Sequence, residues 1–172
     1  MNLTQKKPQP KEKKSKYLRR LYETLRQSGD LKKRIYKLPE LLEITGISLQ
    51  KIRHWNEMGL LVPRFKAVDA QGSQPRFYYS TQTVIKALMI REMCGRGLSL
   101  RQVQRVEKNL GGRGLRLDES VKYLVTNGST ACYSSSPSEA VVDILKHPQQ
   151  MWLIPIYECE QELNKKLKSG VG

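Results

Sequence analysis

The feature that most constrains this chain is a pair of short amphipathic stretches that meet across a glycine. In the run YKLPELLEITGISLQKIRHWNEM, which begins at Tyr36, Pro39 suits the start of a helix and Gly46 suits its end. A second stretch begins after Ser48, whose hydroxyl is a favoured helix cap. The side chains at helical spacing that we expect to be buried in this second helix are Ile52, Trp55 and Met58. The pattern predicts a helix-turn-helix.

Such a pair of helices places its second helix in the major groove of DNA, because a helix is about as wide as that groove. Arginine bonds a guanine edge with two donors, glutamine bonds adenine, and lysine neutralises phosphate. The second helix carries these residue types on its polar faces. We therefore expect contacts to DNA from Ser48, Gln50, Lys51, Arg53 and His54. An ordinary helical hairpin with a solvated charged face would show the same spacing.

The segment after Gly59 predicts a β-hairpin that would form a wing. Its text, LLVPRFKAVDAQGSQPRFYYS, has apolar or aromatic stretches on both sides of a centre rich in Gly, Ser and Gln. We expect phosphate contacts from the basic residues of the arms and from two tyrosine hydroxyls, and one of these tyrosines should also pack in the core. These wing residues are Arg64, Lys66, Arg76, Tyr78 and Tyr79.

Two more helices complete the first part of the chain. Ser80 or Thr81 caps one that continues to the Gly95-Arg96-Gly97 break, and Ser99 begins another. The expected buried stripe of the last helix is Leu100, Val103, Val106 and Leu110.

Charge is divided unequally along the chain. The net charge is +15, and residues 1–109 account for all of it with 24 basic and 9 acidic side chains, while residues 110–172 carry 7 of each. A polyanionic partner is therefore expected to bind the first part. Residues 1–16 predict a disordered basic tail, and residues 17–35 a helix (Tyr17 to Gln27) with a linker.

Residues 111–172 predict a small region of one hairpin and two helices. Asn127-Gly128 favours a tight turn between the strands Lys122 to Thr126 and Ser129 to Tyr133, and a short helix spans Ser138 to Leu145. A last helix from Pro155 carries an apolar stripe that we expect to contact a second copy. The residues of this expected interface are Trp152, Ile156, Cys159, Leu163 and Leu167. The stripe would equally suit packing within the chain, and the hairpin edges offer another place for pairing.

The expected fold class is α+β, mainly helical: a winged helix-turn-helix head at residues 36–110 followed by this dimerisation region. The sequence offers no nucleophile–base pair, paired carboxylates or phosphate loop followed by lysine, so we expect no enzyme and no catalytic residue. The three cysteines, scattered without metal-ligand spacing, favour no metal site or cofactor. No apolar run approaches a membrane span, so we expect a cytoplasmic, nucleoid-associated protein.

The head resembles the winged helix-turn-helix of the MerR family. The matching elements, in order, are Thr45-Gly46-Ile47-Ser48, Arg53-His54-Trp55, Gly59-Leu60-Leu61 with Pro63, Arg76 with Tyr79-Ser80, and Gly97-Leu98-Ser99-Leu100. The chain departs from the family where His54-Trp55 replaces two tyrosines and Asn56 replaces a common Glu. The resemblance implies a homodimer on an inverted repeat of double-stranded DNA, acting as an activator or a repressor.

The compact size and the hairpin-plus-helix end also resemble the small MerR-type repressors carried with type V-K CRISPR-associated transposons. The expected function is that of a sequence-specific, homodimeric repressor that acts at a promoter without a small-molecule effector. An excisionase-like accessory protein, which bends DNA during recombination, is the alternative that would carry a similar head.

Overall fold

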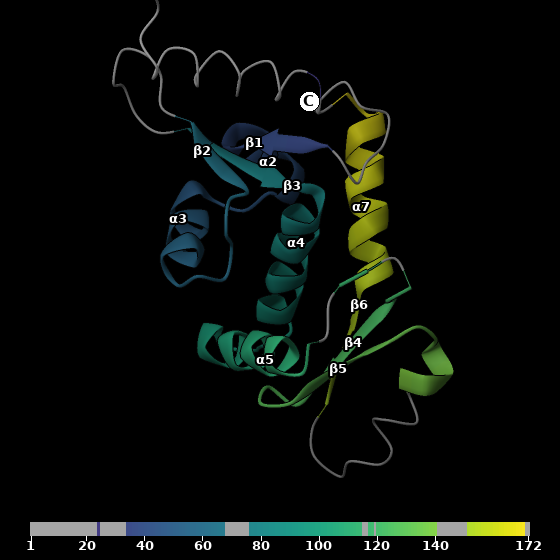
Figure 1. Cartoon of the computed structure of the whole chain (residues 1–172). Coiled ribbons are helices and arrows are strands. Elements are labelled where there is room, and N and C mark those ends of the chain that lie inside the picture. Colours follow the sequence, from purple (N-terminus) through teal and green to yellow (C-terminus); the bar gives the residue numbers. More distant parts are fainter. Residues whose placement is uncertain are drawn as a thin grey trace, which may run out of the picture.

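The structure, a computed structural model, describes residue 24 and residues 34–67, 76–114, 117–118, 120–140 and 151–170. Two small sheets and the helices between and around them form a mixed fold, which confirms the α+β, mainly helical class (Figure 1). The elements in chain order are β1 (Ile35–Lys37), α2 (Leu38–Thr45), α3 (Leu49–Glu57), β2 (Phe65–Ala67), β3 (Arg76–Ser80), α4 (Thr81–Gly95), α5 (Leu100–Gly112), β4 (Tyr123–Thr126), β5 (Ala131–Ser134), β6 (Trp152–Pro155) and α7 (Ile156–Lys168).

The first sheet contains the predicted wing hairpin and one strand that the sequence did not reveal. Its order is β1-β3-β2, and both pairings are antiparallel, with Phe65 opposite Tyr78 and Tyr36 opposite Tyr79. The extra strand β1 has three residues, too few to show an alternating pattern. Its pairing with β3 ties the start of the helix-turn-helix to the wing.

The helix-turn-helix forms where the sequence predicted it. Gly46 ends α2 with a φ of 64°, and its backbone N–H donates to the carbonyl of Leu42 over 2.9 Å. The Ser48 hydroxyl then caps α3 by accepting from the backbone N–H of Lys51. Ser80 and Ser99 cap α4 and α5 in the same way. Short polar side chains at the predicted positions therefore start three of the helices.

Replacing Gly46 with alanine is expected to lower the free energy of unfolding by about 1–2 kcal/mol, because a side chain strains a left-handed backbone. No atom lies within 4 Å of the added Cβ, so the backbone alone sets the cost. Chemical denaturation would measure the change. The matched control is Gly95→Ala at the end of α4, which has open space and no positive φ. Equal effects of the two substitutions would contradict this explanation.

The second sheet contains the predicted hairpin, but its turn is wider than expected. Thr126 pairs with Ala131, so four residues connect β4 and β5 where the sequence suggested a two-residue turn. The Asn127 carboxamide oxygen accepts from the backbone N–H groups of Ser129 and Thr130, which stabilises the longer loop. The third strand, β6, was not predicted and pairs with β4 on its other side.

The second sheet is attached to the helices of the head by polar contacts. The backbone N–H of Ala131 donates to the Asn109 side chain over 3.1 Å, and Arg113 donates to the carbonyl of Ala131 over 3.1 Å. The indole N–H of Trp152 donates to the carbonyl of Arg96 over 3.0 Å. Buried side chains from residues 36–110 and from residues 121–163 belong to one hydrophobic cluster. The change in charge near residue 110 therefore does not mark a break in the core.

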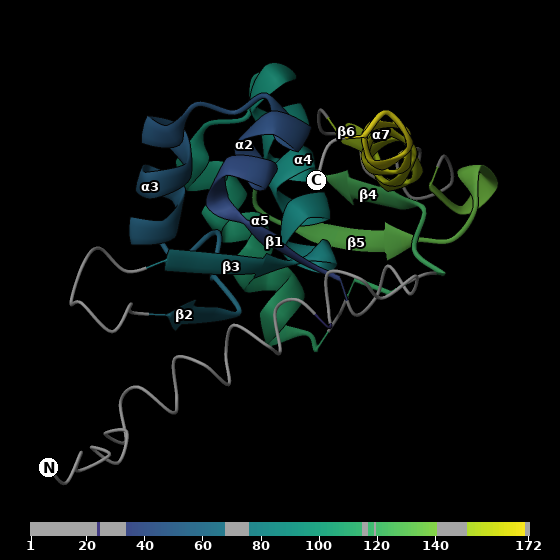
Figure 2. The same cartoon turned by 90° about the horizontal axis from the view of Figure 1, so that it is seen from above.

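Helix α7 packs against α4 and α2 of the same chain, on the side of α4 away from α3 (Figures 1 and 2). Ile156, Cys159 and Leu163, which we expected to meet a second copy, are at most 5% exposed and lie in this core. Trp152 and Leu167 are half-buried and pack against the same cluster. The apolar stripe was predicted correctly, but the chain's own helices cover it.

Several predicted features lie outside the described residues. They are the basic tail at 1–16, nearly all of the helix at 17–27, the wing tip at 68–75, and the predicted helix at 138–145 beyond residue 140.

Candidate nucleic-acid interface

Helix α3 has one buried side and one exposed polar side. Ile52 and Trp55 are 0% and 4% exposed and pack in the core. Gln50, Arg53 and Glu57 follow one another at helical spacing on the opposite side. All five residues predicted for DNA contact on this helix are exposed, namely Ser48, Gln50, Lys51, Arg53 and His54. The helix therefore presents both hydrogen-bonding and basic side chains to solvent.

An amide–phenol contact holds α3 against the wing. The Asn56 side-chain NH₂ donates to the Tyr79 hydroxyl over 2.9 Å. Tyr79 is fully buried, and burial raises the pKa of its phenol, while the hydrogen bond from Asn56 acts in the opposite direction. Asn56 stands where we noted a departure from the family pattern, and sequence reasoning assigned it no role. The structure shows that it connects α3 to β3.

The wing exposes its basic side chains and buries its tyrosines. Arg64, Lys66 and Arg76 are exposed. Tyr78 is 6% exposed, and its ring stacks on Phe65 with the centroids 4.7 Å apart. Both tyrosines that we expected to reach phosphate thus serve as core residues, because their rings hold β3 against β2 and α3. The three basic residues remain as the predicted phosphate contacts of the described arms.

Helix α5 carries a basic stripe that sequence reasoning missed. Arg101, Arg105 and Lys108 are exposed at helical spacing, while Val103 and Val106 between them are fully buried. The missed signal was this alternation, since only the apolar stripe was used to predict the helix.

The basic stripe of α5 lies beside the end of α3. Arg101, Arg105 and Lys108 line an open groove of about 560 Å³ together with Met58, Gly59 and Leu60. Gln104 donates to the carbonyl of Met58 over 3.1 Å, which attaches α5 to the residue that caps α3. The basic side chains of α5 therefore lie beside the residues that follow α3, and Glu107 lines the same groove.

A comparison with family models matches residues 36–110 to the MerR HTH family regulatory protein. These residues are similar to the helix-turn-helix domain of the MerR family. The match covers α2 and α3, the wing, α4, and all of α5 but its last two residues. MerR-family proteins are DNA-binding transcriptional regulators rather than enzymes. A search of curated proteins finds no match to the chain.

Two of the cysteines have thiols whose pKa is raised by burial. Cys159 is buried in α7, and burial raises the pKa of its thiol to about 12. Burial also raises the pKa of Cys94 on α4, and the nearby charge of Lys51 offsets part of this effect. In the described ranges, no three His, Cys, Asp or Glu residues lie close enough to hold a metal ion. No helix in the same ranges is long and apolar enough to cross a membrane.

Proposed function

We propose that the protein is a homodimeric repressor that binds an inverted repeat at a promoter and needs no small-molecule effector. The observation that carries this proposal is the exposed polar side of α3, whose opposite side is fixed in the core by Ile52 and Trp55. The Asn56–Tyr79 contact fixes its orientation to the wing. A rigid helix of this kind presents side chains to base edges at little cost in conformational entropy.

The interface divides into residues that read bases and residues that hold phosphate. Gln50 and Arg53 have the donors and acceptors that match adenine and guanine edges in the major groove. Lys51 and the basic wing residues would neutralise the flanking backbone, and His54 lies beside the base-reading residues. We assign the α5 stripe to the DNA backbone as well, since its basic side chains lie beside the residues that follow α3.

The two subunits are proposed to pair outside the α7 stripe, which the chain's own core covers. Of the alternatives that the sequence offered, the strand edges of the second sheet remain. At β5, part of the edge is occupied, because the N–H and carbonyl of Ala131 bond to Asn109 and Arg113. Light scattering of the purified protein should give twice the monomer mass, and a monomer on the operator would contradict the dimer.

Repression without an effector is supported by the packing of the carboxy-terminal third against the head. Its sheet and α7 share the core of the head, and they bond to α4, to its cap Arg96 and to Asn109 of α5. They therefore act as structural support for the proposed DNA-binding elements. A promoter in a CRISPR-associated transposon is the first target to test, given the resemblance to those repressors. Transcription in vitro should fall when the protein is added alone, whereas a footprint confined to a recombination end would favour the accessory-protein alternative.

Replacing Arg105 with alanine is expected to weaken binding about equally for all DNA sequences. It should also lower the slope of log affinity against log salt by about 1, because one phosphate contact is lost. A fluorescence anisotropy titration at several salt concentrations measures both quantities. The control is Lys165→Ala, which removes the same charge from an exposed position on α7, away from α3. If both variants changed the slope equally, α5 would have no role in the interface.

A further inference from the structure

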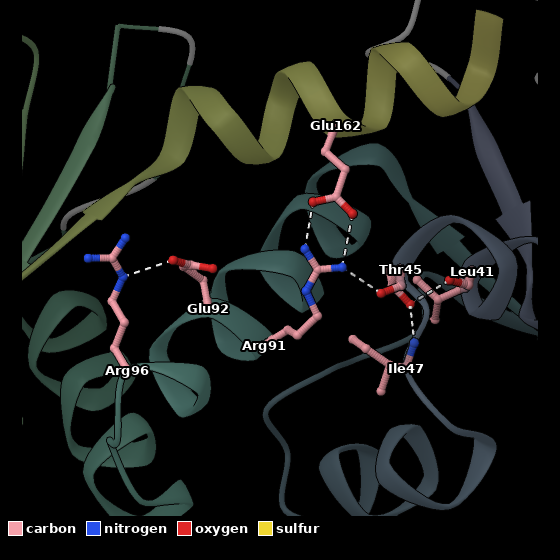
Figure 3. Close-up of polar contacts among 7 residues, drawn as sticks. All are labelled: Leu41, Thr45, Ile47, Arg91, Glu92, Arg96 and Glu162. Carbon is pink, nitrogen blue, oxygen red and sulfur yellow. Dashed lines mark hydrogen bonds and ion pairs between the residues drawn. The ribbon is translucent and has the colours of Figure 1, made fainter. Parts of the chain in front are cut away.

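An arginine on α4 connects the last helix of the chain to the turn of the helix-turn-helix (Figure 3). One guanidinium nitrogen of Arg91 donates to the backbone carbonyl of Thr45 over 2.7 Å and also to Glu162 on α7 over 2.9 Å. The second nitrogen donates to the other carboxylate oxygen of Glu162. The carboxylate thus grips the guanidinium with two parallel bonds, a geometry that fixes the direction of both side chains.

The accepting carbonyl lies at the start of the turn between α2 and α3. Thr45 is the last residue of α2, it is 0% exposed, and Gly46 follows it in the left-handed region. The Thr45 hydroxyl donates to the carbonyl of Leu41 and accepts from the backbone N–H of Ile47. The residue therefore bonds to the chain on both sides of the turn, and Arg91 holds it from a third direction.

Helix α7 has a second ion pair that does not reach this turn. Glu160, two residues before Glu162, pairs with Lys122 next to β4 over 3.3 Å. The side chains of this pair are 39% and 27% exposed, compared with 38% and 34% for Arg91 and Glu162. The two pairs resemble each other in exposure and charge. They differ in their contacts, because the Arg91–Glu162 pair bonds to the turn after α2 and the Lys122–Glu160 pair connects α7 to the residue before β4.

We propose that Glu162 and Arg91 are positioning residues for DNA recognition: the carboxy-terminal helix, acting through Arg91, holds the carbonyl of Thr45 and so fixes the angle at which α3 is presented. This inference rests on the proposed DNA-binding function, and neither residue needs to touch DNA. A change in that angle would misplace base-reading side chains, whereas phosphate contacts tolerate small displacements because they carry no sequence information.

The test compares Glu162→Gln with Glu160→Gln in the full chain. Both substitutions remove an ion pair of α7 and raise the net charge by one. Glu162→Gln is expected to weaken binding to the operator by about three- to tenfold while leaving binding to unrelated duplex DNA unchanged. Glu160→Gln should leave both affinities unchanged. Measurements at a temperature where circular dichroism shows each variant to be folded separate positioning from loss of stability.

Three outcomes would overturn the proposal. In the first, Glu162→Gln binds the operator as tightly as the parent does. In the second, its affinity for the operator and its affinity for unrelated DNA fall by the same factor. In the third, Glu160→Gln loses as much operator affinity as Glu162→Gln does. In the first two cases the ion pair has no role in recognition, and in the third the effect belongs to α7 in general.

A readout without DNA separates this proposal from the proposed function. Amide hydrogen exchange at Gly46 and Ile47 should be faster in Glu162→Gln than in the parent or in Glu160→Gln, because the turn loses one restraint. Unchanged exchange would overturn the positioning role. If the parent itself prefers no DNA sequence, the proposed function fails, and the exchange experiment still decides whether α7 holds the turn.

Discussion

Replacing Trp55 with alanine is expected to lower the free energy of unfolding by about 3–5 kcal/mol, the range for truncating a large buried aromatic side chain. Trp55 is 4% exposed, and it lies in the cluster that joins α3 to α2, the wing and α4. The space it leaves cannot collapse without moving α3. Denaturation by urea, followed by circular dichroism, measures the change.

The control for this prediction lies on the same helix. Leu49 is 37% exposed, so Leu49→Ala removes apolar atoms that are already partly in water, and the expected change is within about 0.5 kcal/mol. If Trp55→Ala were as stable as Leu49→Ala, α3 would not depend on this core contact. Trp55 would then not be the residue that holds α3 in place.

Arg53→Ala is expected to weaken binding to the operator by about 1–3 kcal/mol and to relax the preference for one base pair in each half-site. Arg53 is exposed on the polar side of α3, and a guanidinium bonds a guanine edge through two donors that alanine lacks. Competition titrations with the operator and with operators altered at single positions would measure the loss and locate the base pair.

Lys66→Ala provides the contrast for Arg53→Ala, since both remove one positive charge from an exposed position. The wing substitution should weaken binding to all sequences by a similar factor and leave the base preferences intact. An Arg53→Ala protein that bound its operator as tightly as the parent, or one that only mimicked Lys66→Ala, would contradict a base-reading role for Arg53.

The elements that the sequence predicted are those that depend on local signals. Ser48, Ser80 and Ser99 cap helices because their hydroxyls bond to backbone N–H groups three residues away, so a short stretch of sequence contains the whole interaction. The strands β1 and β6 were missed. Each has only three or four residues, and each exists because a strand distant in the sequence pairs with it.

Sequence reasoning found the part of the candidate site in which the spacing of buried and exposed residues lies within one helix. The exposed side of α3 follows from the spacing of Ile52 and Trp55 alone. The basic stripe of α5 could have been found in the alternation of its residues, but its place beside the end of α3 could not. That place and the Asn56–Tyr79 contact depend on which elements become neighbours, which a linear pattern does not specify. For the same reason, the apolar stripe of α7 predicted a covered face but not that α4 and α2 would cover it.

The most direct test of the central claim is a footprint of the purified full-length protein across DNA that includes the candidate promoter. We expect protection of an inverted repeat with two half-sites separated by about one turn of the DNA helix, roughly 10 base pairs centre to centre, or a multiple of it. Binding that follows salt concentration but protects no preferred sequence would contradict it, because the exposed side of α3 would then serve phosphate binding alone.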